Sequence, residues 1–531
     1  MEKFKPYLVA IFAAFIYALG HPNIINILIP IAPIIGTTIL FYLFFKSSNL
    51  KQNIFSLILF NLFITLFSFH WIANTLVEFG QIPFVLAILA NAFYLFLFNP
   101  YNWFILGFIY FFKKQKVALN SLHSLSLATL SSLVEYFFPQ QFPVLLGQPW
   151  IVLSEYLGLA SLFGLFAFSF TSYLIVFEVI RFKITKQFCR INISFIILFI
   201  ALNPVFSSIT KTDSIKEKKD FNIRIVQANI SNYLKLASEA GEENSVESVL
   251  KKYQNLSNQP APRPIDLIIW PETAYPYPIY RDKDNIDKTV LPDLFIDIIA
   301  KQKADLAIGS YDNHKEHTES TYQTDSNAAF FITAQGKLSD VYQKHILIPF
   351  GETLPFGPLN ELLAPYVQEM AFFKEGETFP VFQSTTKKGI GFISTICYEL
   401  LKPEYIREYL NNTKSRPDFL INMTNDSWYG DTVEPEQHLF LTKWRAIEFK
   451  LPIVRSTNTG ISVVIDENGK ELQRLNIYEA ANLDINLKLS NEKENFQLWY
   501  KKFGIWAFIP FILLLFLFHL ILLKLKNEKN Y

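Results

Sequence analysis

Cys397 has the clearest chemical potential in this chain, because it is one of only two cysteines among 531 residues. It ends an apolar run, GIGFISTICYEL, of the kind that forms a buried strand running into a turn. A thiol at such a strand end can be exposed while its backbone is held rigidly, and backbone N–H groups there favour the reactive thiolate. The same pattern also fits a small buried hydrophobic residue, so the neighbouring polar residues decide the interpretation.

Two other polar residues follow strand-like runs. Glu272 follows DLIIW in the segment WPETAYP, and Lys344 lies in YQKHILIPFGE. A carboxylate that accepts a proton, a cation that stabilises an oxyanion and a thiol nucleophile together form a complete set for acyl transfer. Each residue alone also fits an ordinary helix cap or surface position, and their separation along the chain does not by itself define a site.

The region that carries these residues, 221–490, alternates between strand-like and helical patterns. The strand-like runs are NIRIVQANI, DLIIW, DLAIGSY, NAAFFITAQ, GIGFISTIC, DFLINMTN and PIVRSTNTGISVVID. Helical patterns cover 243–256, 290–303, 400–412 and 435–449. Buried strands interleaved with amphipathic helices predict a layered α/β domain, preceded by a charged linker at 209–220.

The rest of the chain is too apolar for an ordinary soluble protein, with 51% hydrophobic residues and 53 Phe in total. Long apolar stretches, each able to cross roughly 30 Å of hydrocarbon, fill residues 1–208. We predict about seven transmembrane helices there, at 6–20, 24–45, 53–77, 83–112, 121–138, 152–180 and 191–208. An eighth span is predicted at 504–523, which gives a polytopic helical membrane domain joined to the α/β domain.

Positive charges predict the orientation of these spans. Lys and Arg occur before span one, between spans two and three, four and five, and six and seven, and after span eight, whereas the alternate short loops have none. We therefore expect both termini in the cytoplasm and residues 209–503 on the outer side. Cys189 falls in an inner loop and cannot pair with Cys397, so the outer domain has a single cysteine.

Taken together, WPETAYP, YQKHILIPFGETLPFG and ICYEL resemble the three catalytic motifs of the nitrilase superfamily, a Glu-Lys-Cys arrangement on an αββα sandwich. With the eight spans, the longer forms of these motifs resemble the apolipoprotein N-acyltransferases. The segments NDSWYGDT, QHLFLTKWRAIE and RSTNTGISVVID are also similar to that family's pattern. The resemblance covers essentially the whole chain.

The resemblance implies a role for each matching residue. Cys397 would be the nucleophile, Glu272 the general base and Lys344 the oxyanion donor. The supporting residues implied by the family motif are Glu352, Tyr398 and Glu399.

The chain departs from the family pattern after VQANI. The family usually has a Lys-Trp pair there, whereas this chain reads YLKLAS, so Lys235 matches and Leu236 replaces the tryptophan. This difference bears on how the substrate is gated and not on the chemistry. Segment 350–382 is rich in apolar side chains, and we expect a mobile arm that dips toward lipid or, alternatively, an amphipathic helix packed on the domain.

The implied reaction transfers a fatty acyl chain from a phospholipid, through a Cys397 thioester, to the N-terminal amine of the diacylglyceryl cysteine of an apolipoprotein. This is the last step of bacterial lipoprotein maturation. The implied location is the inner membrane, with a multi-pass chain and a periplasmic catalytic domain. The expected partners are the phospholipid donor and the apolipoprotein acceptor, and no nucleic acid.

Two other classes of protein fit parts of the pattern. A membrane-tethered, nitrilase-like amidase would use the same three residues with water as the second substrate. A transporter or scaffold would only bind a ligand, but the predicted spans contain almost no charged residues, which disfavours transport. His345 and His438 show no metal-ligand spacing with carboxylates or cysteines, so we expect neither a metal nor a cofactor.

Overall fold

The computed structural model describes residues 4–528 apart from 79–81, 99–100, 115–118, 141, 213–217, 282–285, 314–324, 350, 355, 364–365, 367–371 and 491–498. The chain divides into two compact units. The helical unit comprises Met1–Asp213, Tyr429–Lys450 and Phe496–Tyr531, and the catalytic unit comprises Ser214–Trp428 and Leu451–Asn495. Each unit is described by itself below.

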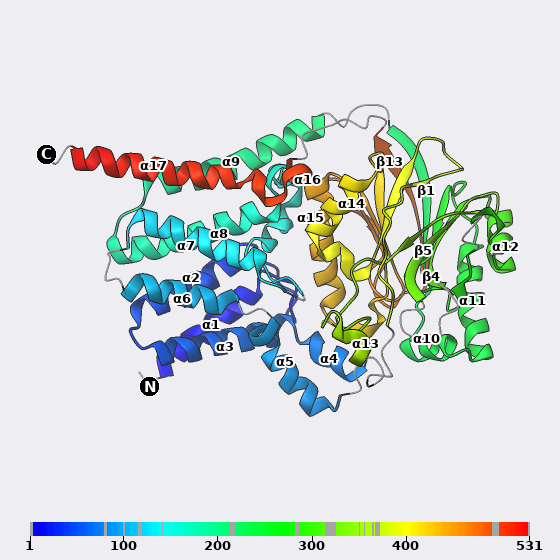
Figure 1. Cartoon of the computed structure of the whole chain (residues 1–531), viewed down its shortest axis with the longest axis horizontal. Helices are drawn as coiled ribbons and strands as arrows, with labels where there is room; N and C mark the ends of the chain where they lie inside the picture. The colour runs from blue at the N-terminus through cyan, green and yellow to red at the C-terminus, as the bar shows by residue number, and fades with distance from the viewer. Residues whose placement is uncertain are drawn as a thin grey trace. The chain divides into compact units, whose positions relative to one another are not determined.

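The helical unit is built from apolar helices that pack along their neighbours in the sequence, as Figure 1 shows for α7 and α8. The N-terminal helices are α1 (Lys5–Ala18), α2 (Ala32–Lys46), α3 (Leu50–Ser68), α4 (Trp71–Glu78), α5 (Phe84–Phe98) and α6 (Tyr101–Lys114). They are followed by α7 (Ser121–Phe137), α8 (Ala160–Thr185), α9 (Arg190–Thr212), α16 (Trp499–Phe503) and α17 (Ile509–Glu528). Asparagine caps fix two of the starts, since the side chains of Asn49 and Asn120 accept hydrogen bonds from Gln52 N and His123 N.

Four helical stretches of the described chain are long and apolar enough to cross a membrane. These are Leu50–Ser68, Ala160–Thr185, Arg190–Ile209 and Trp499–Leu525. Two shorter apolar helices, Lys5–Ala18 and Ala32–Lys46, fall below that length. The helices are compatible with a membrane protein, and each of these six stretches overlaps a predicted span.

Several predicted spans differ from the helices observed, and 53–77 is one of them because it contains both α3 and α4. The stretch 24–45 is helical only from Ala32, because Asn23 holds the preceding loop by donating its side-chain N–H groups to the carbonyls of His21 and Ile27. The stretch 83–112 contains two helices, α5 and α6, where a single span was predicted. Hydropathy averages over such breaks, so it locates apolar segments better than their ends.

Helix α15 (Glu434–Phe449) lies within the predicted catalytic domain in the sequence but belongs to the helical unit. Gln437 explains part of this placement. Its side-chain N–H₂ donates to the carbonyls of Pro22 at 2.8 Å and Ser68 at 2.6 Å, while its oxygen accepts from Trp71 Nε1 at 3.0 Å. A buried amide with partners on both ends fixes the helix at a defined position among its neighbours.

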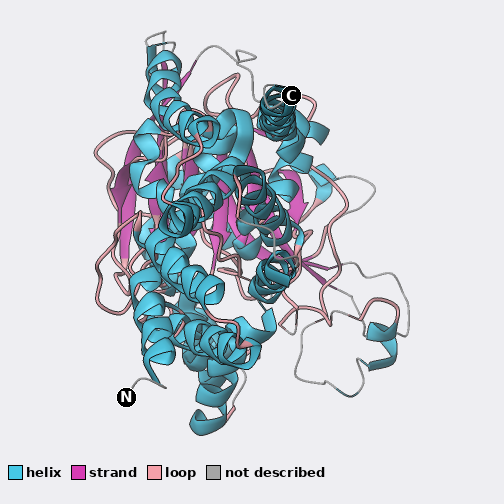
Figure 2. Ribbon diagram, turned by 90° about the vertical axis from the view of Figure 1, so that its left-hand side faces the viewer, coloured by secondary structure: helices cyan, strands magenta, loops and turns pink. Residues whose placement is uncertain are grey.

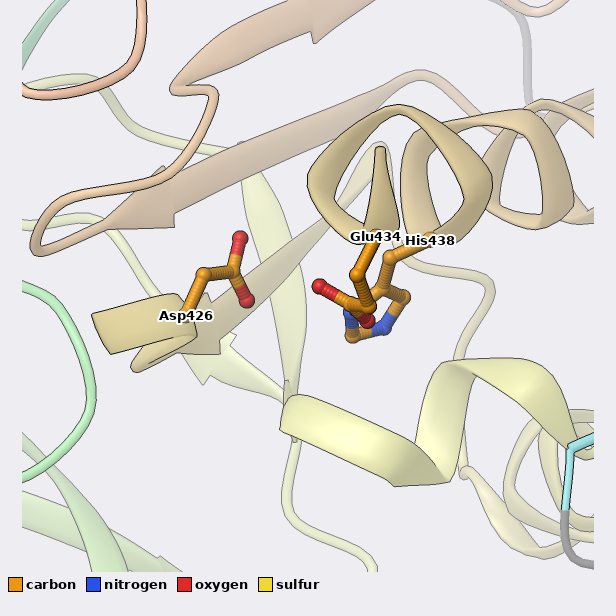
Figure 3. A group of neighbouring side chains, drawn as sticks. All are labelled: Asp426, Glu434 and His438. Carbon is orange, nitrogen blue, oxygen red and sulfur yellow. The ribbon is translucent and has the colours of Figure 1, made fainter. Parts of the chain in front are cut away.

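Other polar side chains of α15 are also buried in the helical unit. Trp444 Nε1 donates to the Gln148 carbonyl, and Glu448 accepts from the backbone N–H of Leu165. Figure 3 shows Glu434 and His438 on adjacent turns of the helix, with a carboxylate oxygen 3.7 Å from the imidazole Nδ1. Asp426, the third residue labelled there, belongs to the catalytic unit, where it pairs with Arg455.

The catalytic unit contains two sheets. The first has the order β13 (Ala481–Ser490), β1 (Lys218–Gln227), β2 (Leu267–Ile269), β4 (Asp305–Asn313), β5 (Asp325–Ile332) and β6 (Leu338–Gln343), with β3 (Pro278–Ile279) pairing to β4. The second has the order β12 (Glu471–Arg474), β11 (Val463–Ile465), β10 (Ile453–Thr457), β9 (Phe419–Thr424), β8 (Gly391–Ile396) and β7 (Phe382–Gln383). All strands are magenta in Figure 2.

The two sheets face each other through aromatic side chains, including Phe221 against Phe419 and Phe331 against Phe392. Helices α11 (Glu243–Ser257) and α12 (Asp293–Gln302) cover the outer face of the first sheet, as Figure 1 shows. Trp270 stacks on Tyr253 of α11 within that core. This confirms the predicted layered α/β architecture and most of its predicted strands.

Candidate active site

The nucleophile candidate lies where the sequence predicted, at the carboxyl end of a buried strand. β8 ends at Ile396, and a short 3₁₀ helix, η6 (Cys397–Leu401), begins with the cysteine itself. Cys397 has a φ of 50°, a left-handed conformation that a residue with a Cβ adopts only at an energetic cost. The sharp turn therefore begins at the cysteine itself, directly after a strand that fixes its backbone.

The other two candidates lie together as an ion pair. Lys344 follows β6 and is fully buried, with its Nζ 3.3 Å from Glu272 Oε1 and 2.8 Å from Glu352 Oε1. Asn327 of β5 donates to both of these carboxylate oxygens, at 2.8 and 3.2 Å. The backbone N–H of Asn425 donates to the second oxygen of Glu272. The two glutamates thus share one cation and one amide.

Burial and the shared cation set the protonation states. Burial raises the pKa of Glu272, and Lys344 only partly opposes this shift. Burial alone would lower the pKa of Lys344, but Glu352 and Glu272 more than offset it, so its pKa is raised and it stays an ammonium ion. Glu272 is therefore a stronger proton acceptor than an exposed glutamate and remains held by a permanent cation.

The thiol differs from the sequence prediction in two respects. Cys397 is only 5% exposed, and burial raises its pKa, with Glu272 adding to the rise and Lys344 opposing it. The prediction that the turn favours an exposed thiolate is therefore wrong, because burial disfavours the charged form of the thiol and the negative charge of Glu272 adds to this effect. The resting group is a thiol, so a nucleophilic role for Cys397 would require a base that takes its proton.

Glu399 connects the nucleophile turn to the lysine loop. Its Oε2 accepts from Ile396 N at 2.7 Å and from the Tyr342 hydroxyl, while its Oε1 accepts from His345 N at 2.6 Å and Ile346 N at 3.1 Å. Burial raises the pKa of Glu399 to about 7, although these donors oppose the shift. The side chain joins the residue before Cys397 to the residues after Lys344, and so fixes the distance between the two loops.

Tyr398 lies beside Cys397 and is almost fully buried. The Lys402 ammonium lies 4.7 Å from the centre of its ring, a cation–π contact, and burial lowers the pKa of Lys402 to about 8. The other supporting candidate, Glu352, also accepts from Ile348 N at 2.9 Å. The structure therefore brings Glu272, Lys344 and Glu352 into direct contact and gives Tyr398 and Glu399 positions that brace the turn.

Three asparagines that contact the candidate residues were not singled out from the sequence. Besides Asn327 and Asn425, Asn422 of β9 donates to the Cys397 carbonyl at 3.4 Å and accepts from the buried Arg455. Asn327 opens the strand-like run NAAFFITAQ, and Asn425 ends DFLINMTN. Polar residues at the ends of buried strands were the signal used for Glu272 and Cys397, and it applies to both of these asparagines as well.

The expected arm is described only in part. Phe356 and Tyr366 are 48% and 83% exposed, which suits a contact with lipid, and α13 (Leu359–Leu363) has no buried residue. Phe373, in contrast, stacks on Tyr311 of β4. Met370 lies outside the described residues. The mobility of this segment and its contact with lipid stay predictions.

Comparison with known proteins gives a consistent family. The carbon–nitrogen hydrolase family model matches residues 222–487. The apolipoprotein N-acyltransferase of Bdellovibrio bacteriovorus is 30% identical over 502 residues, covering 90% of this chain and 87% of that protein. Those of Shewanella oneidensis and Haemophilus ducreyi are 29% and 26% identical, over 68% and 78% of this chain and 67% and 78% of theirs.

Among solved structures, Saccharomyces cerevisiae Nit3, of branch 10 of the nitrilase superfamily, aligns with 51% of this chain and 91% of its own at 17% identity and a TM-score of 0.34. The family assignment rests on the sequence relatives, since the family model spans half of this chain and the Bdellovibrio protein matches it almost end to end. The chain belongs to the apolipoprotein N-acyltransferase family, and residues 222–487 form its nitrilase-like carbon–nitrogen hydrolase domain.

Proposed function

We propose that this protein transfers a fatty acyl chain from a membrane phospholipid to the N-terminal amine of a diacylglyceryl-modified apolipoprotein, through a thioester on Cys397. The observation that carries the proposal is the buried Glu272–Lys344–Glu352 cluster, whose Glu272 and Lys344 act electrostatically on the Cys397 thiol, in a chain of the apolipoprotein N-acyltransferase family. A carboxylate base, an ammonium ion and a thiol are the groups that acyl transfer needs.

In the first half-reaction, the Cys397 sulfur attacks the ester carbonyl while Glu272 takes the thiol proton. The carbonyl oxygen becomes an oxyanion, which Lys344 stabilises. An ammonium group has three N–H donors, and Glu272 and Glu352 accept two of them, so the third is left for the oxyanion. Collapse breaks the C–O bond, and the lysophospholipid leaves with the proton returned by Glu272.

In the second half-reaction, the acceptor amine attacks the thioester carbonyl and gives a proton to Glu272. The C–S bond breaks, the amide forms, and the proton restores the Cys397 thiol. Because the donor product leaves before the acceptor reacts, the kinetics are ping-pong. Burial of the site keeps water from the thioester, which favours transfer over hydrolysis.

The direct test supplies the purified full-length protein with a phospholipid carrying a labelled acyl chain and with a diacylated lipopeptide. We expect lysophospholipid and a triacylated lipopeptide in equal amounts, and a labelled thioester when the acceptor is omitted. Free fatty acid as the only acyl product, with no triacylated lipopeptide, would refute the transferase and favour a hydrolase.

We also propose that the chain crosses the bacterial inner membrane eight times, with both termini in the cytoplasm and the αββα domain in the periplasm. The alternation of positively charged loops supports this orientation. It places the active site on the side where exported apolipoproteins arrive.

Two exposed positions test this topology in a chain whose own cysteines are replaced by serine. Lys251→Cys lies on α11, where the native side chain is 66% exposed, and Gln187→Cys lies in the exposed loop between α8 and α9. A membrane-impermeant maleimide applied to spheroplasts should label position 251 at once and position 187 only after permeabilisation. Labelling of position 187 in intact spheroplasts, or protection of position 251, would contradict the orientation.

A further inference from the structure

A buried lysine outside the acyl-transfer cluster contacts the segment that carries Glu272. Lys235 lies on α10 (Asn232–Glu239), a short helix that the sequence patterns did not predict. Only 7% of the residue is exposed. Its Nζ donates to the Thr273 carbonyl at 2.9 Å and the Thr273 hydroxyl at 2.6 Å, and it pairs with Glu239 Oε1 at 2.8 Å. All three ammonium donors are thus engaged, so Lys235 has none left for a substrate.

The residue that Lys235 holds is strained. Thr273 immediately follows Glu272 and has a φ of 45°, in the left-handed region. Such a conformation is unfavourable for a β-branched residue and persists only where its surroundings impose it. The Lys235 ammonium group binds both the carbonyl and the hydroxyl oxygen of Thr273. The observed conformation of Thr273 brings these two acceptors to the same ammonium group.

The same segment also packs closely against β4. A Cβ on Gly309 would lie 2.4 Å from Pro271 O, 2.6 Å from Glu272 Cα and 2.6 Å from Thr273 N. The Gly309 carbonyl in turn accepts from Tyr275 N. Only glycine permits this approach, so the segment that carries Glu272 is held both by its close packing on β4 and by Lys235.

The lysine is itself held in place. Glu239, which lies one turn after Lys235 on α10, accepts a hydrogen bond from the Tyr311 hydroxyl at 2.6 Å. Tyr311 belongs to β4, the strand that carries Gly309. A chain of contacts therefore runs from Tyr311 of β4 through Glu239 and Lys235 to Thr273. Both the Lys235 contacts and the Gly309 contacts link the Glu272 segment to the same strand, β4.

We propose that Lys235 is a positioning residue for the acyl-transfer reaction, which holds Thr273 in its left-handed conformation and thereby fixes the Glu272 carboxylate between Lys344 and the thiol. The inference rests on the proposed role of Glu272 as the base. The Lys235 charge also lowers the pKa of Glu272, beneath the larger effects of burial and Lys344, so its loss has an electrostatic consequence as well as a geometric one.

The test measures single-turnover thioester formation in the full-length protein with Lys235→Met. Misplacing a reacting group by about 1 Å costs roughly 10²-fold in rate, so we expect a fall of about 10- to 100-fold. The phospholipid concentration that gives half the maximal rate should change little, because Lys235 has no free donor. The acidic limb of the pH–rate profile should move to higher pH, since Glu272 must be ionised to act as the base and its pKa rises when a cation is removed.

The matched control is Lys251→Met. Lys251 also pairs with a glutamate one turn away, at 2.5 Å from Glu247, but on the exposed face of α11. We expect wild-type rates from it. If Lys235→Met does not fold, Lys235→Arg supplies the test. It keeps the charge but cannot place a compact ammonium between two acceptors of one residue, so the rate should fall while the pH profile stays in place.

A second background tests the strain directly. Glycine adopts a positive φ at little cost, so Lys235→Met should reduce the rate less in a Thr273→Gly protein than in the wild type. An equal or larger reduction would overturn the proposal, as would a wild-type rate for Lys235→Met. Glu272→Gln, measured in parallel, separates the proposed function, in which Glu272 is the base, from the proposed role of Lys235. An active Glu272→Gln would refute the proposed function, whereas an inactive one beside a wild-type-like Lys235→Met would refute the role of Lys235 alone.

Discussion

Replacing Cys397 with alanine should abolish both thioester formation and N-acylation, while the protein still folds and inserts. The reason is that the Glu272–Lys344–Glu352 cluster contains a base and an oxyanion donor but no nucleophile. Without the Cys397 sulfur, no bond to the acyl carbonyl can form. In a hydrolase that forms a covalent intermediate, removing the nucleophile lowers the catalytic rate on the order of 10⁶-fold. The measurement is mass spectrometry of the peptide containing residue 397 after incubation with phospholipid, together with an assay of the triacylated product.

Cys397→Ser should be nearly as inactive. A serine hydroxyl is a much weaker acid than a thiol, and burial already raises the pKa of the native thiol, so a carboxylate base is far less able to deprotonate the hydroxyl. Cys189→Ala is the matched control, because Cys189 is the only other cysteine and lies in the helical unit. Full activity in Cys189→Ala and none in Cys397→Ala is expected. Retained N-acylation in Cys397→Ala would exclude the cysteine as nucleophile.

The position of Cys397 at a strand end was predictable from the sequence because it depends on local patterns. The apolar run before Cys397 forms β8, and Cys397 itself begins the turn that follows, as the strand-end pattern indicated. DLIIW likewise forms β2 just before Glu272. Strand ends are set by hydrophobic patterning and turn residues within a few positions, so a single sequence contains that information.

The contacts of the same residues were not predictable, because they join segments that are distant in the chain. Asn327 bridges Glu272 and Glu352, and Glu399 reaches the loop after Lys344. The burial of Cys397 has the same origin, and it reverses the expected direction of the thiol pKa. These properties depend on how strands pair across a sheet, and only the family resemblance indicated that these residues act together.

Helix α15 illustrates a different limit of sequence reasoning. Its segment matches the family pattern and reads as an amphipathic helix of the α/β domain, yet nearly all of its side chains are buried and its polar residues find partners in the helical unit. Hydrophobic periodicity treats Gln437 and Glu448 as surface residues, because it cannot anticipate a specific hydrogen-bond partner. Leu236 shows the opposite case, in which an apolar residue lies at the surface. It occupies the position of the family tryptophan and is 51% exposed.

Lys344→Arg should lose most of the activity although it keeps the charge. The native ammonium is fully buried, and it contacts two carboxylates while one donor stays free for the oxyanion. A planar guanidinium is wider and directs its donors in a fixed fork, so it cannot pair with both glutamates and also place one N–H at the oxyanion position. Losing a single oxyanion donor typically costs about 10²–10³ in rate.

Lys344→Met should cost more than Lys344→Arg, because it also leaves Glu272 and Glu352 together without a cation. One of the two glutamates must then stay protonated, and the pKa of the other rises above its value in the parent protein. Raising the pH would restore an ionised base, but it should not restore the activity, because the oxyanion donor is missing. The rate of thioester formation in a single turnover measures both variants. Lys337→Met is the matched control, since Lys337 precedes the same strand, β6, and has an exposed side chain. If Lys344→Arg reacts within about threefold of the parent, the buried lysine is not the oxyanion donor, because no guanidinium rotamer could reproduce the geometry that this role requires.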